Sequence, residues 1–162
     1  MAISLRQDEH SAFDILGEGE CLWLLAHTFI GRVGVGVGAL PAIFPVNYTM
    51  REGAIYFRTD DGTKLTAAVR GAAVAFQIDS FDKYYHQGWS VLAVGMAEEV
   101  PDPEASELSD VLALEAWAPG PHRHLIRIRP EFVSGRRIGF PHLEQGLSAH
   151  SSEGEWHADV EA

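Results

Sequence analysis

Six stretches of this chain have the residue pattern of β-strands, and this restricts the fold more than any other feature. They span residues 31–38, 41–50, 54–59, 72–79, 89–100 and 124–129, and the last is expected to continue past Pro130 to residue 138. A turn followed by a helix is expected over 18–26, with further helices over 63–69 and 103–116. Neighbouring strands joined by short turns pair antiparallel, so the sequence predicts a mainly β fold, a closed or half-closed barrel with a few short helices.

The first predicted strand alternates glycine with valine. One face of this run carries Val33, Val35 and Val37, and the other carries Gly34, Gly36 and Gly38. A period of two is typical of a strand, and glycine within a strand marks the close approach of another backbone or a ligand. A dinucleotide-binding fingerprint would require a helix directly after the glycines, but Pro41 follows instead, so a tightly packed strand is favoured.

The length and composition indicate one globular domain. The chain has 162 residues, of which 46% are hydrophobic, enough for a core of its own. Residues 1–12 are expected to form a polar leader and residues 13–140 the domain. From residue 141 to residue 162, Gly, Ser, Glu and His accumulate with few large apolar side chains, which predicts a mobile acidic tail.

The charge and cysteine content exclude several classes of partner and location. With 12 Lys and Arg against 23 Asp and Glu, the formal charge is −11, which argues against nucleic acid or an anionic membrane surface as a partner. The single Cys21 cannot form an internal disulfide, so a cytoplasmic location is expected. No apolar run approaches the roughly 20 residues that span a bilayer, and the acidic first residues do not match a secretion signal.

A polar segment between a predicted strand and a predicted helix suggests a phosphate site. Arg58 and Thr59 end the strand, and Thr63 and Lys64 open the helix. Hydroxyl and backbone N–H groups at a helix start point at an anion, and the two cations would neutralise it. Alternatively, the charges are solvated and Thr63 or Asp61 merely caps the helix, so both interpretations stay open.

Two further groups are candidates for binding a planar ring. Asn47 lies mid-strand after Pro45 and Val46, and its amide can hydrogen-bond either a heterocycle or a neighbouring strand. Trp89 and Ser90 begin another strand, where the indole could wall in a flat ring or pack in the core. The sequence alone does not decide between these alternatives.

The remaining reactive residue types give no catalytic assignment. None of the eight histidines has the spacing typical of a zinc site, so no metal is predicted, although a single histidine could still bind haem. The chain lacks a Gly-x-Ser-x-Gly elbow, which argues against nucleophilic hydrolysis. No catalytic acid or base is therefore assigned.

The order of the motifs resembles the pyridoxamine 5′-phosphate oxidase-like family of flavin-binding split β-barrels. The resemblance covers roughly residues 13–139 and rests on the phrases at 31–35, 41–48, 55–59, 62–65, 74–79, 88–91, 95–100, 126–130 and 135–137. It implies a six-stranded antiparallel split barrel that forms a homodimer with two FMN sites at the interface. It also implies a set of cofactor-binding residues: Pro45, Val46 and Asn47 along the isoalloxazine, Arg58, Thr59, Thr63 and Lys64 at the phosphate, and Trp89 and Ser90 near the ring or phosphate.

By this resemblance the chain would be an FMN-dependent oxidoreductase acting on a small organic substrate. An Arg-x-His-x-Arg phrase that would hold pyridoxal phosphate has no match here, so oxidation of vitamin B6 is not expected. Three alternatives remain: a reductase of the same fold that uses the deazaflavin F420, a non-enzymatic flavin- or haem-binding protein, and a barrel that has lost its cofactor.

Overall fold

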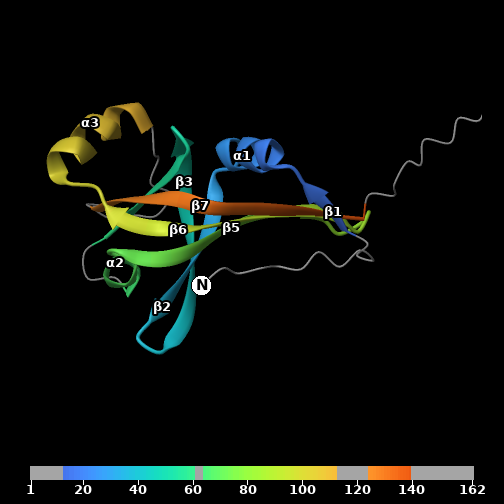
Figure 1. Cartoon of the computed structure of the whole chain (residues 1–162), viewed down its shortest axis with the longest axis horizontal. Coiled ribbons are helices and arrows are strands. Elements are labelled where there is room, and N and C mark those ends of the chain that lie inside the picture. Colours follow the sequence, from blue (N-terminus) through green and yellow to red (C-terminus); the bar gives the residue numbers. More distant parts are fainter. Residues whose placement is uncertain (1–12, 61–63, 113–123, 140–162) are drawn as a thin grey trace, which may run out of the picture.

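A computed structural model describes residues 13–60, 64–112 and 124–139 (Figure 1). The expected leader at 1–12, Thr63, the end of the third predicted helix at 113–116 and the expected tail at 141–162 lie outside the described residues. These expectations stay predictions.

The described chain contains seven strands and three helices. Their order is β1 (Phe13–Leu16), α1 (Glu18–Ala26), β2 (Ile30–Val37), β3 (Leu40–Arg51), β4 (Ala54–Thr59), α2 (Lys64–Val69), β5 (Ala72–Asp82), β6 (Gln87–Glu99), α3 (Asp102–Leu112) and β7 (His124–Ile138). The six predicted strands and three predicted helices all form, and β7 continues through Pro130 as expected.

Six of the strands close into a ring, which confirms the antiparallel barrel. The sheet order is β1-β7-β4-β3-β2-β5-β6, and β6 pairs again with β7. The first half of β7 pairs with β4, whereas its second half pairs with β1 from Gly135 to Ile138. β1 is thus a seventh strand beside the ring, in a stretch for which the sequence analysis predicted no strand. A four-residue strand directly before Gly17 has too short a pattern to be recognised without its partner.

The interior of the ring is filled by apolar side chains. Among the largest fully buried ones are Phe57, Phe76, Ile78 and Ile126. Tyr48 meets Phe76 edge to face, with ring centroids 4.7 Å apart. The Tyr48 hydroxyl donates a hydrogen bond of 2.8 Å to the carbonyl oxygen of Leu25 and so ties α1 to the barrel. Burial raises the pKa of this phenol well above its usual value, which keeps it a donor.

A second apolar cluster lies on the outer face of the barrel, beneath α3. It is formed by buried residues of β4, β7 and the chain after β6, against which two residues of α3 pack: Ala54, Tyr56, Val100 and Leu125 with Ala105 and Leu108. Tyr56 alternates with Phe57, which faces the interior, so the two clusters lie on opposite faces of β4. α3 therefore covers part of the outer face.

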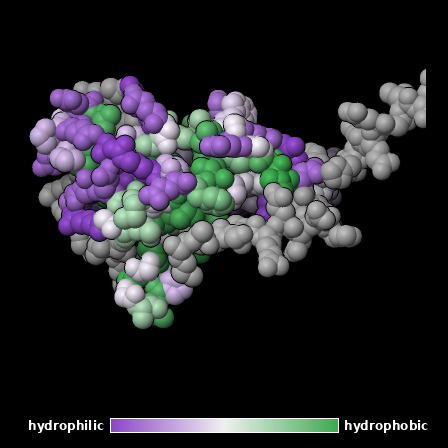
Figure 2. Space-filling view, viewed as in Figure 1, coloured by the Kyte–Doolittle hydropathy of each residue, from purple (hydrophilic) through white to green (hydrophobic). Residues whose placement is uncertain are grey.

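The hairpin of β2 and β3 protrudes from the barrel (Figure 1). β2 pairs with β5 only from Arg32 to Gly34, and β3 pairs with β4 only from Tyr48 onward. In Figure 2 this hairpin is pale to green, in contrast to the purple end of the molecule at α3. Leu40 and Ile43 on it are 73% and 69% exposed, so a large apolar surface faces outward.

Among the residues that the structure describes, no helix has both the length and the apolar character needed to cross a membrane.

Gly31 is required by the core. A Cβ atom placed on it would lie 2.2 Å from the Cζ atom of Phe76. We expect Gly31→Ala to lower the free energy of unfolding by about 1–3 kcal/mol, the usual cost of overpacking, and urea denaturation measures this. Phe76→Leu should restore part of the loss when combined with it.

Gly36→Ala is the matched control, because no atom lies within 4 Å of the corresponding Cβ position in the same strand. Its stability should equal or slightly exceed that of the parent protein. Equal effects of the two alanine substitutions would contradict the close contact between Gly31 and Phe76.

Candidate cofactor site

The predicted ring-binding residues of β3 and the predicted phosphate-binding residues of β4 lie where these two strands part, whereas Trp89 and Ser90 lie on β6. The last paired residues of these strands are Tyr48 and Phe57. Beyond that pair, β3 leads to Asn47 and Pro45, whereas β4 leads to Arg58 and on toward α2. The structure therefore brings the predicted ring-binding stretch and the predicted phosphate-binding stretch to the same opening of the sheet.

The backbone of β3 offers polar groups to this opening. The N–H of Tyr48 donates to the carbonyl oxygen of Phe29, 3.0 Å away, on the side of β2. Because backbone groups of successive residues in a strand point to opposite sides, those of Asn47 and Pro45 point away from β2. Pro45 has no N–H, and its backbone faces the side of β3 that has no strand partner at this position, where a proline breaks no ladder hydrogen bond.

The predicted site residues divide between the two faces of the barrel. Strand alternation puts four of them on the outer face, namely Pro45, Asn47, Arg58 and Ser90. Val46 and Thr59 are buried on the inner face, and Trp89 packs half-buried against the interior core. The outer face is thus the one that offers these groups to a ligand.

The hydroxyl of Thr59 contacts α2. Its Oγ1 lies 3.1 Å from Oγ1 of Thr66, whose hydroxyl donates to the carbonyl oxygen of Asp60 at 2.7 Å. These bonds tie the end of β4 to α2, whose first residue is Lys64. They fix the positions of both ends of the connection that contains Thr63, which itself lies outside the described residues.

A polar group that the sequence analysis missed lies beside Thr59. His124 pairs with Thr59 across the strands, and its Nδ1 contacts the carboxylate of Glu99. The other oxygen of this carboxylate lies 2.8 Å from Nε of Arg70. In residues 13–60, 64–112 and 124–139, no three or more His, Cys, Asp and Glu side chains are grouped so that they could hold a metal ion.

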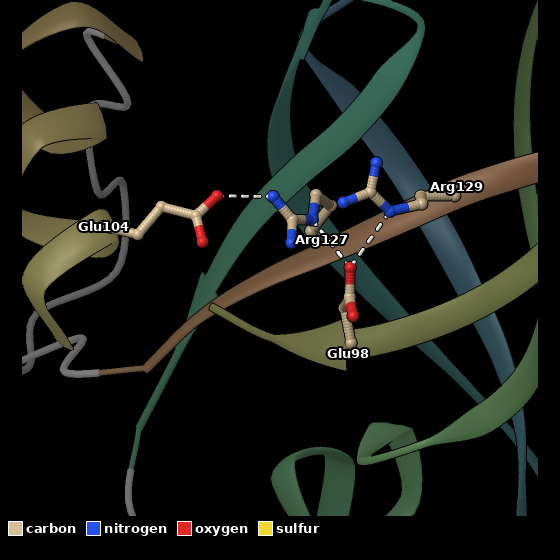
Figure 3. Close-up of polar contacts among 4 residues, drawn as sticks. All are labelled: Glu98, Glu104, Arg127 and Arg129. Atoms are coloured by element: carbon tan, nitrogen blue, oxygen red, sulfur yellow. Dashed lines mark hydrogen bonds and ion pairs between the residues drawn. The ribbon is translucent and has the colours of Figure 1, made fainter. Parts of the chain in front are cut away.

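Arg127 connects α3 to the barrel (Figure 3). Its Nε donates to Glu98 at 2.8 Å, and its Nη1 donates to Glu104 of α3 at 2.6 Å. Arg129 also donates to Glu98, at 3.1 Å. Burial of the Arg127 guanidinium lowers its pKa, but the hydrogen bonds outweigh this and raise the pKa above its ordinary value. α3 is therefore held over the outer face by charge as well as by apolar packing.

A second polar cluster lies on the outer face between β2 and β5. Nη1 of Arg32 contacts the Asp79 carboxylate and lies 3.3 Å from Oε1 of Gln77. The Gln77 amide donates to Asp79 at 3.0 Å. Arg32 is the cross-strand partner of Pro45, and Asp79 is that of Ser90. The sequence analysis missed this cluster, because Arg32 is more than forty positions from Gln77 and Asp79 along the chain.

A sequence model of the pyridoxamine 5′-phosphate oxidase family matches residues 17–137. The chain belongs to this family. One relative is an uncharacterized protein of Mycobacterium tuberculosis. It is 37% identical over 142 residues, which cover 83% of this chain and 93% of the relative. The family resemblance drawn from the sequence is confirmed.

Two solved structures of similar fold are FAD-binding proteins. The one from Mycobacterium smegmatis is 33% identical, with a TM-score of 0.61 over 78% of this chain and 98% of the other. The one from Mesorhizobium loti is 25% identical, with a TM-score of 0.59 over 78% of this chain and 98% of the other. Both FAD-binding proteins therefore align with this chain over almost their whole length.

The ion pairs of Glu98 make stability depend on pH. Hydrogen bonds from Arg127 and Arg129 lower the pKa of this carboxyl, so its contribution is present above the unfolded pKa and is lost as the pH falls through the folded pKa. Glu98→Gln should cost less than about 1 kcal/mol at pH 7, because the side chain is nearly half exposed. Urea denaturation from pH 7 toward pH 3 should show the difference from the parent shrinking.

Glu131→Gln is the control, since Glu131 is exposed on the same strand as Arg127. It should change stability little at any pH in this range. A Glu98→Gln effect that stays constant down to pH 3 would show that the loss is not caused by the charge of Glu98.

Proposed function

We propose that this protein is an FMN-dependent oxidoreductase whose flavin lies on the outer face, where β3 and β4 part. The observation that carries the flavin site is the similarity to the Mycobacterium smegmatis FAD-binding protein over almost its whole length, and the choice of FMN rests on the family resemblance. The residues at the opening between β3 and β4 agree with it, because the part common to all flavin nucleotides combines a planar ring that hydrogen-bonds along one edge with a phosphate.

The residues at this opening suit both parts of that ligand. Arg58 and Lys64 supply two cations for the phosphate. The backbone groups of Pro45 and Asn47 face the open side of β3, where they can bond to the polar edge of a ring. The flavin would supply hydride or electron transfer, while the protein binds it, orients it and, through α3, covers part of the neighbouring face.

FAD is the second candidate for the cofactor, because two similar structures are FAD-binding proteins. FMN and FAD share the ring, the ribityl chain and the first phosphate, so the same residues would hold either one. The sequence also left F420 and haem open as cofactors, and titrating each of them into the protein tests whether either binds.

Lys64→Ala should weaken flavin binding by about 1.5–3 kcal/mol, the scale of a hydrogen bond to a charged group. Titrations of FMN and of FAD into the purified protein, followed by absorbance and flavin fluorescence, give the dissociation constants. The parent protein should saturate at one flavin per chain, and the FMN and FAD constants identify the preferred nucleotide.

The matched control is Lys83→Ala, which removes the lysine that lies over the Tyr84 ring at the turn between β5 and β6. It should leave flavin affinity unchanged. A Lys64→Ala protein that binds as tightly as the parent would remove Lys64 from the site. Parent protein that binds neither flavin but binds F420 or haem would keep the fold and replace the chemistry.

The proposed site is completed by a second copy of the chain in a homodimer. The outer face carries exposed apolar side chains on the hairpin strands, namely Ile30 and Ile43. A face of this kind is stable in water when another surface covers it. In the homodimer, the partner subunit would supply Ser90 and the rim of the flavin site, as the family resemblance implies.

Ile43→Asp should shift the protein from dimer to monomer, because it puts a charge at the centre of the apolar outer face. Light scattering at micromolar concentration measures the change, and flavin affinity should fall with it. Trp23→Asp, at an exposed position on α1 rather than on the outer face of the sheet, should leave the dimer intact. A parent protein that is monomeric at this concentration would rule out the two-chain site.

Several finer expectations remain proposals. The substrate would be a small organic molecule other than a vitamin B6 phosphate, since the phrase that holds pyridoxal phosphate is missing. The cytoplasmic location still rests on the single Cys21. A non-enzymatic flavin carrier would bind flavin equally well but would show no turnover with any electron acceptor.

A further inference from the structure

Arg32 emerges on the outer face beside the stretch of β3 at the proposed flavin site. It is the cross-strand partner of Pro45, and such partners have Cβ atoms about 4.5–5.5 Å apart on the same face of the sheet. Pro45 is exposed and short, so it leaves the guanidinium uncovered. The Arg32 side chain is 49% exposed, although it forms an ion pair.

The guanidinium is held through one nitrogen and presents the others. Both contacts of Arg32, to Gln77 and to Asp79, use Nη1, and Asp79 is in turn fixed by the Gln77 amide. In the described part of the chain, Nε and Nη2 of Arg32 donate to nothing. Arg127 differs, because its Nε and Nη1 both form ion pairs and its side chain is only 12% exposed. Arg32 is therefore oriented by the fold but keeps hydrogen-bond donors for a ligand.

The backbone groups of β3 determine which edge of the flavin ring would lie near Arg32. Apart from N5, the hydrogen-bonding groups of an isoalloxazine lie on its pyrimidine ring, whereas the dimethylbenzene edge has none. The open backbone groups of Pro45 and Asn47 therefore suit the pyrimidine side. Arg58 lies on β4 beside Asn47, whereas Arg32 lies on β2 beside Pro45, so the two cations are on opposite sides of β3. The N1–C2=O edge of the ring adjoins the ribityl chain that leads to the phosphate.

We propose that Arg32, oriented by Asp79 and Gln77, donates to the N1–C2=O edge of the bound flavin and raises its reduction potential. This inference rests on the flavin site proposed above. When a flavin takes up two electrons and one proton, the added negative charge rests on N1 and C2=O. A guanidinium at that edge binds the reduced form more tightly than the oxidised form, and a difference of this kind shifts the potential.

Arg32→Met keeps much of the side-chain stem but removes the charge. We expect the affinity for reduced flavin to fall about tenfold more than the affinity for oxidised flavin, which lowers the potential by about 30 mV for a two-electron couple. The measurements are the dissociation constant of the oxidised flavin and the potential of the bound flavin, titrated against a reference dye. If the role of Arg32 were purely structural, the substitution would weaken the binding of oxidised and reduced flavin equally and leave the potential unchanged.

Asp79→Asn provides an independent test with the opposite sign. It keeps Arg32 but removes the negative charge that offsets it, so the potential should rise. Arg51→Met, at the far end of β3, should change neither quantity. If Arg32→Met does not fold, the sign of the Asp79→Asn shift decides the matter.

The outcomes separate this inference from the proposed function. A parent protein that binds no flavin refutes the flavin site itself, and with it this role of Arg32. A parent protein that binds flavin, with potentials unchanged in Arg32→Met or Asp79→Asn, overturns the role of Arg32 alone.

Discussion

The pairing of β7 determines where a ligand can bind. This fifteen-residue strand pairs with β6 along one edge and divides its other edge between β4 and β1. Closing the ring in this way satisfies the backbone groups of β4 and β6, and it leaves the far part of β3 with a neighbour on one side only. The opening between β3 and β4, and the polar backbone exposed there, follow from that closure.

The position of α3 depends on apolar packing together with ion pairs. Among the described side chains of α3, Ala105 and Leu108 pack against the apolar cluster of β4 and β7. The half-buried guanidinium of Arg127 joins Glu104 on the helix to Glu98 on the sheet, so the helix is fixed in register as well as pressed onto the face.

The sequence predicted the elements well and the contacts poorly, for identifiable reasons. The alternation of Val33 and Val35 with glycine is a local pattern, so β2 and its inner face could be predicted. β1 has no local pattern, and it exists because β7 has a free edge beside it. Likewise, Thr59 was expected to face a phosphate, but only the position of Thr66 in the folded chain shows where its hydroxyl bonds. Arg32 had no signal of its own, since its partners lie on another strand.

The width of the ring explains why the chemistry must be on the outside. An eight-stranded barrel is just wide enough for its interior side chains, and this six-stranded ring is filled by residues such as Phe57 and Phe76. A planar ring cannot enter, so the candidate residues that reach a ligand are those on the outer face, where water weakens every charge interaction. Excluding that water requires a second surface. The exposed apolar side chains around Ile43 are suited to bind one, so cofactor binding and association of two chains would depend on the same face of the sheet.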